Sequence, residues 1–249
     1  MWWAKVRLLA WPPIQFNFRI HFAKEIEFPE LVEVKQQADN ELAPYAGLAK
    51  AWHEIARSSV ANYPGFLCSA RSSIGPIQSV LELACGAGTL TERLARVAPE
   101  VVGLDLSSAM LEEARVRCSA IPSIRLLHED FRSFNISQNF DAVVCASDSL
   151  NYVRDLSEFH EVLQSVASHL GRGGLFVFDT LTEKGMKSLS GSYLHGYTKS
   201  TRYAVGFQYD PSSRREESIA YLPSGFERHR RMPLDPSDVT AAANGTGLM

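Results

Sequence analysis

Two carboxylates flank a pair of glycines in an order that can build a nucleotide pocket. Glu82 lies in the apolar run Val80–Leu83, Gly86 and Gly88 follow it, and Asp105 ends the next apolar run. Glycines let the backbone approach a ligand closely, and a turn that opens a helix presents free amide donors. An acid about 20 residues further along is the expected holder of ribose hydroxyls. The two acids therefore favour a ligand with an ammonium group and a free ribose over one with many phosphates.

The glycine turn differs from two other nucleotide-binding fingerprints. A dinucleotide-binding loop follows the pattern G-x-G-x-x-G, and Thr91 occupies the third glycine position here. A P-loop needs Gly-Lys followed by Ser or Thr, which this turn does not have. A nicotinamide enzyme is therefore an alternative that Thr91 disfavours.

Apolar runs and helical patterns alternate through the middle of the chain. We expect two helices over 43–72, then strands near 79–84, 101–105, 124–128, 140–146 and 174–179, with helices near 89–97, 107–118 and 153–170. Continuous apolar runs are typical of parallel strands that are covered on both faces. Right-handed crossovers then give an α/β fold with a doubly wound, mostly parallel Rossmann-like sheet. Its ligand crevice lies at the carboxyl ends of the strands.

The segment after the fifth of these strands has a different periodicity. Apolar and polar residues alternate over 203–209, Asp210-Pro-Ser-Ser forms a turn, and further strands are expected near 215–222 and 225–231. We predict an antiparallel β insertion over about 190–232. A helix begins near Pro236, which suits a first helical turn.

Five motifs in this order resemble those of class I S-adenosylmethionine-dependent methyltransferases. The motifs are Glu82–Thr89, Gly103–Leu111, His128–Phe131, Phe140–Tyr152 and Gly173–Asp179. The resemblance covers roughly residues 43–240 and implies S-adenosylmethionine as the cofactor. The family often has a Tyr-Asp pair where Trp52-His53 stands, so this chain departs from the pattern in the helices before the first core strand.

The resemblance assigns the amino-acid end and the ribose of the cofactor to the first two motifs. Glu82 is implied to hold the methionine ammonium group, Gly86 and Gly88 to permit close backbone approach, and Asp105 to bind the ribose hydroxyls. The structural alternatives are a strand-end acid that caps nearby amides, a plain tight turn, and an acid at a helix N-terminus. Ala84 stands where a glycine is often found.

The adenine is assigned to the third motif and its neighbours. Asp130 is implied to accept a hydrogen bond from the adenine amino group, with Phe131 and Met110 against the ring. Alternatively, Asp130 caps its loop, and Met110 is a core residue.

The catalytic candidate is Tyr152, which follows the fourth motif strand. Related sugar-amine N-methyltransferases have a histidine at this place. A phenol near its normal pKa of about 10 is a poor base, so we expect Tyr152 to orient the acceptor. Packing at a helix start is the alternative. Asp148 and Asn151 are candidates for acceptor contacts or for turn formation.

The charged stretch Phe226–Arg231 contains Arg228 and His229 and is similar to a Glu-Arg-His stretch in the aminosugar enzymes. It could face substrate phosphates. The favoured interpretation is a solvated face, because most charge runs are exposed.

The chain divides into an N-terminal extension of uncertain order (1–40) and a methyltransferase domain (41–249). Residues 14–22 alternate like a half-buried strand, with a poorly ordered leader as the alternative. Family members continue with strands 6 and 7, which are apparently missing here. The fifth strand would then be an exposed apolar edge, which the N-terminal segment or a homodimer partner could cover. A truncated or mis-spliced gene product is the other interpretation.

Composition limits the partners of the protein. The 249 residues are 45% hydrophobic and 21% charged, and the net charge is -3. Without a strong basic patch or a long apolar run, we expect neither a nucleic-acid partner nor a membrane. The four cysteines are too far apart for a metal site, and we expect reduced thiols, no metal and a cytoplasmic location. The expected partner is a small-molecule acceptor.

These observations predict an enzyme that transfers a methyl group from S-adenosylmethionine to an amine or hydroxyl of a small molecule. The alternative is a non-catalytic S-adenosylmethionine-binding or interaction protein.

Overall fold

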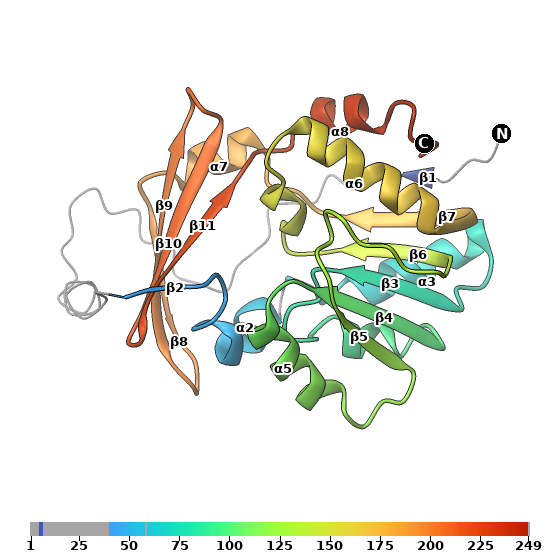
Figure 1. Ribbon diagram of the computed structural model, residues 1–249, viewed down its shortest axis with the longest axis horizontal. Coiled ribbons are helices and arrows are strands. Elements are labelled where there is room, and N and C mark those ends of the chain that lie inside the picture. The colour runs from blue at the N-terminus through green and yellow to red at the C-terminus, as the bar shows by residue number, and fades with distance from the viewer. Residues whose placement is uncertain (1–4, 7–39, 58, 249) are drawn as a thin grey trace.

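Two β-sheets lie side by side in the computed structural model, which describes residues 5–6, 40–57 and 59–248 (Figure 1). The first sheet has the strand order β1-β7-β6-β3-β4-β5, and all its pairs are parallel. Its strands are β1 (Lys5–Val6), β3 (Ser79–Leu83), β4 (Glu100–Asp105), β5 (Ile124–His128), β6 (Phe140–Cys145) and β7 (Leu170–Phe178).

The second sheet has the order β2-β11-β10-β9-β8. Its strands are β2 (Glu41–Leu42), β8 (Tyr193–Tyr197), β9 (Arg202–Asp210), β10 (Arg215–Leu222) and β11 (Gly225–Arg231). Strands β8 to β11 form an antiparallel meander inside the predicted insertion, while β2 pairs in parallel with β11. Helix α2 (Ala49–Ala56) lies between the two sheets (Figure 1).

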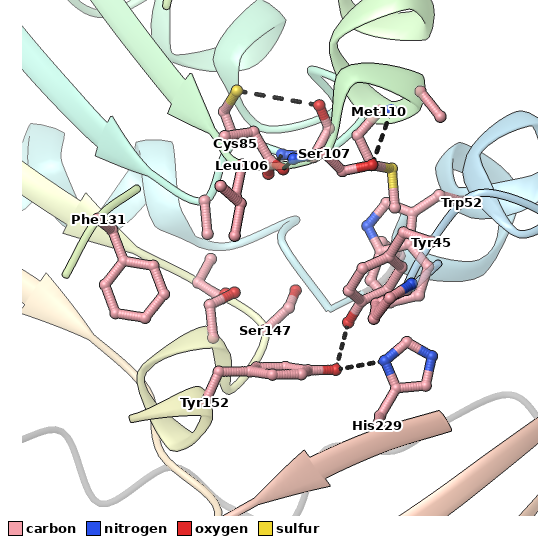
Figure 2. A pocket seen from close by; sticks show the side chains of 18 of the residues that line it. Tyr45, Trp52, Cys85, Leu106, Ser107, Met110, Phe131, Ser147, Tyr152 and His229 are labelled. Carbon is pink, nitrogen blue, oxygen red and sulfur yellow. Dashed lines mark hydrogen bonds between the residues drawn. The ribbon is translucent and has the colours of Figure 1, made fainter. Parts of the chain in front are cut away.

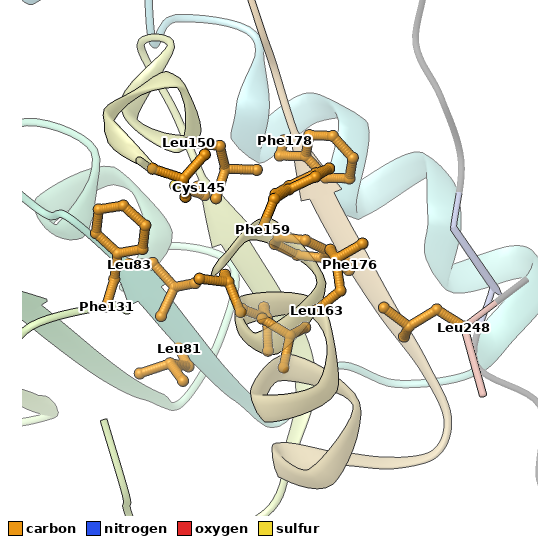
Figure 3. Packing of buried hydrophobic residues seen from close by; sticks show 14 of the residues in the cluster. Leu81, Leu83, Phe131, Cys145, Leu150, Phe159, Leu163, Phe176, Phe178 and Leu248 are labelled. Atoms are coloured by element: carbon orange, nitrogen blue, oxygen red, sulfur yellow. The ribbon is translucent and has the colours of Figure 1, made fainter. Parts of the chain in front are cut away.

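Alternate residues of the parallel strands pack on opposite faces of the first sheet. Leu81 and Leu83 belong to the cluster with α6 (Leu156–His169) and α8 (Pro236–Ala243), and Figure 3 shows Phe159 and Leu163 of α6 in this layer. Val80 belongs to the other cluster, with α3 (Tyr63–Ile74) and α4 (Thr91–Leu94). Helices therefore cover both faces, which confirms the predicted doubly wound α/β fold.

The boundaries differ from the prediction where local signals are weak. The helix expected over 89–97 is regular only over α4, and the helix expected from 153 begins at Leu156, after the 3-10 helix η1 (Ser149–Tyr152). Helix α5 (Ser108–Cys118) starts as expected, since the Ser107 hydroxyl accepts a hydrogen bond from the Met110 amide. Helix α7 (Glu183–Leu189) and strands β2 and β8 were not predicted.

The outer side of β7 is paired within the described part of the chain. Lys5 and Val6 of β1 lie in register with Leu175 and Phe176. The alternating segment 14–22, which was expected to cover this edge, lies outside the described residues. The division into 1–40 and 41–249 stays a prediction. Within the described ranges, no helix is both long and apolar enough to cross a membrane.

Asn151 of η1 links the segments that follow the two sheets by hydrogen bonds. Its side chain is fully buried, and its amide nitrogen donates to the carbonyls of Leu181 and Met232, each at 2.7 Å. Its amide oxygen accepts from the Leu181 N–H at 2.8 Å, and its own carbonyl accepts from the Met232 N–H. The chain segments after β7 and β11 are thus held at one point, so turn fixation and not acceptor binding accounts for this residue.

We expect Asn151→Ala to lower the free energy of unfolding by about 2–4 kcal/mol, because it leaves buried backbone groups without hydrogen-bond partners. Urea denaturation followed by circular dichroism measures this. The matched control is Asn135→Ala, at an exposed asparagine, with an expected change within about 0.5 kcal/mol. Equal losses in the two variants would contradict the fastening role.

Candidate active site

A cavity of about 650 Å³ opens at the carboxyl ends of the central strands of the first sheet. Its lining includes the predicted residues Glu82, Gly86, Asp105, Met110, Asp130, Phe131 and Tyr152. The second sheet and the turn before α2 close the opposite side through His229 and Tyr45 (Figure 2). This is the predicted place for a ligand crevice in an open parallel sheet.

Glu82 carries a carboxyl group that is only 2% exposed. Thr91 donates a hydrogen bond to its Oε2 at 2.6 Å, and burial raises its pKa to about 8, with Asp105 adding to the rise and the Thr91 bond opposing it. The carboxyl is therefore largely protonated at neutral pH without a cation nearby. A buried carboxyl beside a cavity can be stabilised as a carboxylate by a cationic ligand.

Asp105 ends β4 and fixes the glycine turn after β3. Its Oδ2 accepts from the Gly86 amide at 2.7 Å, and its Oδ1 accepts from the Ser107 amide at 2.8 Å. Burial raises its pKa, while these two amide bonds oppose the rise. The Leu106 amide adds a third bond of this kind, and a carboxylate has about four lone-pair sites, so Asp105 keeps little free acceptor capacity beside the cavity that it lines.

The two glycines of the turn have different surroundings. Gly86 (φ +54°) lines the cavity, and a Cβ there would lie 3.2 Å from the Trp52 indole nitrogen. Gly88 (φ +73°) does not line the cavity, and a Cβ there would lie 3.1 Å from Ala114 Cβ on α5. Close helix packing, rather than ligand approach, accounts for Gly88.

The residues expected beside an adenine lie together at the β4 and β5 ends. Met110 and Phe131 are nearly buried and line the cavity. Asp130 also lines it, but its carboxylate accepts hydrogen bonds from the backbone amide and the guanidinium of Arg132. Burial alone would raise the pKa of Asp130, but the Arg132 bonds and charge outweigh burial and lower it. The loop-capping alternative is therefore present in the structure.

The turn before α2 forms a lid that the sequence only partly indicated. Trp52 lies over Gly86, and the Tyr45 ring packs edge-on against it with centroids 5.0 Å apart. Tyr45 has a backbone φ of +65°, a conformation that residues other than glycine rarely adopt. His53 faces Thr89, with Nδ1 and Oγ1 at 3.1 Å. Although Trp52-His53 replaces the usual pair, these residues still cover the glycine turn.

Three polar side chains form a hydrogen-bonded row opposite the glycine turn (Figure 2). Tyr152 Oη lies 2.8 Å from Tyr45 Oη and 3.0 Å from His229 Nδ1. Burial raises the pKa of both tyrosines, so both are neutral phenols over the physiological range. A neutral phenol can orient an amine or a hydroxyl by hydrogen bonding.

The interpretation of 226–231 as a solvated face is wrong for three of its five polar residues. Glu227 is fully buried and His229 is 5% exposed, while Arg231 pairs with Asp148 and with Glu216. Arg228 and Arg230 lie on the other face of the strand, where both pair with Glu217, and both are also among the residues that line the cavity. Alternation with period two in a strand was the available signal, since Glu227, His229 and Arg231 share one face.

Asp148 does not line the cavity. Its carboxylate pairs with Arg231, and its backbone has φ +51° next to Ser147 at +59°. Burial raises its pKa to about 6, against the lowering effect of Arg231. Its turn-forming alternative therefore describes its place better than acceptor contact.

The remaining polar clusters add no further site. All four cysteines are free thiols. Among the residues that the structure describes, no group of three His, Cys, Asp or Glu side chains could hold a metal ion.

Residues 80–174 match the family described as a methyltransferase domain. The dTDP-4-amino-2,3,4,6-tetradeoxy-D-glucose N,N-dimethyltransferase of Saccharopolyspora spinosa is 33% identical over 109 residues, covering 44% of this chain and 43% of that protein. The dTDP-3-amino-3,4,6-trideoxy-alpha-D-glucopyranose N,N-dimethyltransferase of Streptomyces venezuelae is 35% identical over 109 residues, covering 44% and 45%. The chain thus spans less than half the length of these two relatives.

An S-adenosylmethionine-dependent methyltransferase from Clostridium acetobutylicum has a similar structure, with a TM-score of 0.70 and 23% identity. The similarity covers 82% of this chain and 87% of that one, which includes more than the matched domain. The domain match and the shared fold support S-adenosylmethionine as the cofactor. Residues 80–174 are thus similar to a methyltransferase domain, and the fold is that of the S-adenosylmethionine-dependent methyltransferases.

Proposed function

We propose that this protein transfers a methyl group from S-adenosylmethionine to an amine or hydroxyl of a small molecule. The observation that carries the proposal is one cavity with two chemically different walls. One wall has buried acids at a glycine turn, and the other has the Tyr45–Tyr152–His229 row. A concave, mostly apolar site with a few convergent polar groups is typical of small-molecule binding.

The first wall fits the parts of the cofactor. Glu82 would hold the ammonium group, because a cation stabilises its ionised form at a buried position. Asp105 lines the cavity and would bind a ribose hydroxyl with the acceptor capacity that its backbone amide bonds leave. Met110 and Phe131 offer apolar and aromatic surface for the adenine, and Asp130 is the polar group beside them.

The second wall orients the acceptor. When bound, S-adenosylmethionine would supply a sulfonium-activated methyl group, with S-adenosylhomocysteine as the leaving group and the acceptor proton lost to water. The phenol of Tyr152 lies in the cavity and can accept a hydrogen bond from an acceptor N–H or O–H. Alignment of the acceptor is the main contribution that such residues make to a displacement reaction. Tyr152 is therefore the proposed contact to the acceptor.

The acceptor class follows from the same row. Hydrogen-bonding side chains favour an acceptor that carries an amine or a hydroxyl over an apolar carbon centre. The relatives named as aminosugar N,N-dimethyltransferases support an amine. We expect no nucleic-acid or membrane partner, and a cytoplasmic location stays a prediction.

We expect S-adenosylhomocysteine to bind the wild-type protein and Asp105→Ala to bind it roughly 10- to 100-fold more weakly, because the carboxylate would make charge-assisted bonds to the ribose. Isothermal titration calorimetry measures both affinities. The matched control is Asp141→Ala. Asp141 also accepts two backbone amides, from Gln78 and Ser79, but lies away from the cavity.

Asp141→Ala should lower the melting temperature without weakening the binding. Wild-type protein that does not bind S-adenosylhomocysteine would overturn the proposed function. Binding without turnover on a panel of amines and alcohols would favour the non-catalytic alternative.

A second prediction concerns protons. If the ligand ammonium pairs with Glu82, that carboxyl must ionise on binding, so binding at pH 7 should release close to one proton. Because the pKa in the free protein is about 8, affinity should rise between pH 6 and 8. Calorimetry in buffers of different ionisation enthalpy counts the released protons. Glu82→Gln should abolish both effects, and an unchanged proton count in that variant would exclude the pairing.

A further inference from the structure

A buried carboxylate of the second sheet ties the lid to β11. Glu227 is fully buried, and its Oε2 accepts from the Tyr45 amide at 2.9 Å. Its Oε1 accepts from the amides of Gly47 at 2.5 Å and Leu48 at 3.0 Å. Three backbone amides just before α2, which have no partner within the helix, therefore donate to one carboxylate from a strand about 180 residues further along.

This contact determines the shape of the lid turn. A Cβ on Gly47 would lie 3.1 Å from Glu227 Oε1 and 2.7 Å from a Leu222 methyl, so only glycine permits the approach. Tyr45 is held at φ +65° by the same carboxylate. Strained backbone persists where the surroundings over-determine it. The lid turn then directs the Tyr45 phenol toward Tyr152 and places Trp52 over Gly86.

The same carboxylate faces the other end of the polar row. His229 lies two residues further along β11 on the same face, and its Nε2 is 3.3 Å from Glu227 Oε2. The contact does not have hydrogen-bond geometry, but a carboxylate at this distance still favours a proton on Nε2, since an unprotonated nitrogen would repel it. In the neutral ring, Nδ1 is then an acceptor, and Tyr152 donates its hydroxyl proton to it at 3.0 Å.

We propose that Glu227 is a positioning residue that shapes the lid turn and sets the direction of the hydrogen bonds in the Tyr45–Tyr152–His229 row. Because the Tyr152 hydroxyl donates its hydrogen bond to His229, its oxygen lone pairs are left to accept hydrogen bonds from Tyr45 and from the cavity. The acceptor side is therefore built to receive a hydrogen-bond donor. The functional meaning of this arrangement rests on the proposed methyl transfer, whereas the arrangement itself is testable without it.

Glu227→Gln is the sharpest variant. Whichever way the new amide is turned, its NH₂ group faces at least one backbone N–H of the lid turn. We expect hydrogen exchange of the amides of Tyr45, Gly47 and Leu48 to accelerate roughly tenfold or more. The affinity for S-adenosylhomocysteine should fall roughly fivefold or more, because Trp52 loses its fixed place over Gly86.

The matched control is Glu217→Gln, on β10 of the same sheet, where the carboxylate pairs with Arg228 and Arg230 and accepts no amide of the lid turn. It should leave lid exchange unchanged. Exchange in α6, which contacts neither glutamate, should be the same in all three proteins and shows that the variants are folded. Wild-type lid exchange in folded Glu227→Gln would overturn the proposal.

The row is tested by the ring nitrogens of His229. In protein labelled with ¹⁵N-histidine, the signal lost in His229→Asn identifies this ring. At neutral pH we expect Nε2 to be protonated and Nδ1 to be unprotonated. A ring protonated at Nδ1 would overturn the proposed direction of the bonds. Failure of the wild-type protein to bind S-adenosylhomocysteine counts against the proposed function and leaves the exchange and NMR results to decide this inference.

Discussion

Buried carboxylates that accept backbone amides of neighbouring turns hold this site together. Asp105 at the end of β4 takes the amide of Gly86, in the turn after β3. Asp179, just after β7, takes the amides of Ser147 and Asp148, in the turn after β6. Glu227 takes the amides of the lid turn. In each case, a carboxylate on or just after one strand binds the backbone of a turn next to a different helix or strand. The cavity lies among these turns.

This arrangement explains where the strained backbone is found. Tyr45, Ala84, Ser147 and Asp148 are four of the five described non-glycine residues with positive φ, and all lie in or beside these turns. Such conformations cost of order 1–3 kcal/mol each. The amide–carboxylate bonds offset that cost, so the turns keep one shape before a ligand arrives. Pre-formed polar sites of this kind lower the reorganisation that binding and transfer would require.

Local patterns in the sequence were enough to predict most of the residues that line the cavity at the strand ends. The parallel strands are continuous apolar runs, and Glu82, Gly86 and Asp105 occur at strand ends close together in sequence. The acceptor side is different, because the partners of Glu227 and Tyr152 lie about 180 and 77–107 residues away. The period-two alternation puts Glu227 and His229 on one face of β11, but it does not show that this face is buried against the lid turn and Tyr152. Gly88 shows the converse case, because its place in a motif does not distinguish ligand approach from helix packing.

The two walls of the cavity also differ in their similarity to known proteins. The matched residues 80–174 contain Glu82, Asp105 and Tyr152, but neither Tyr45 nor Glu227 nor His229. The similarity in fold extends over 82% of the chain at 23% identity, so it supports the scaffold of the acceptor side without fixing its side chains. The lid turn and the second sheet, which Glu227 joins, lie outside the matched residues and form the other wall of the cavity. The two walls are therefore built from parts of the chain with different degrees of similarity to known proteins, and Glu227 holds the less similar part in place.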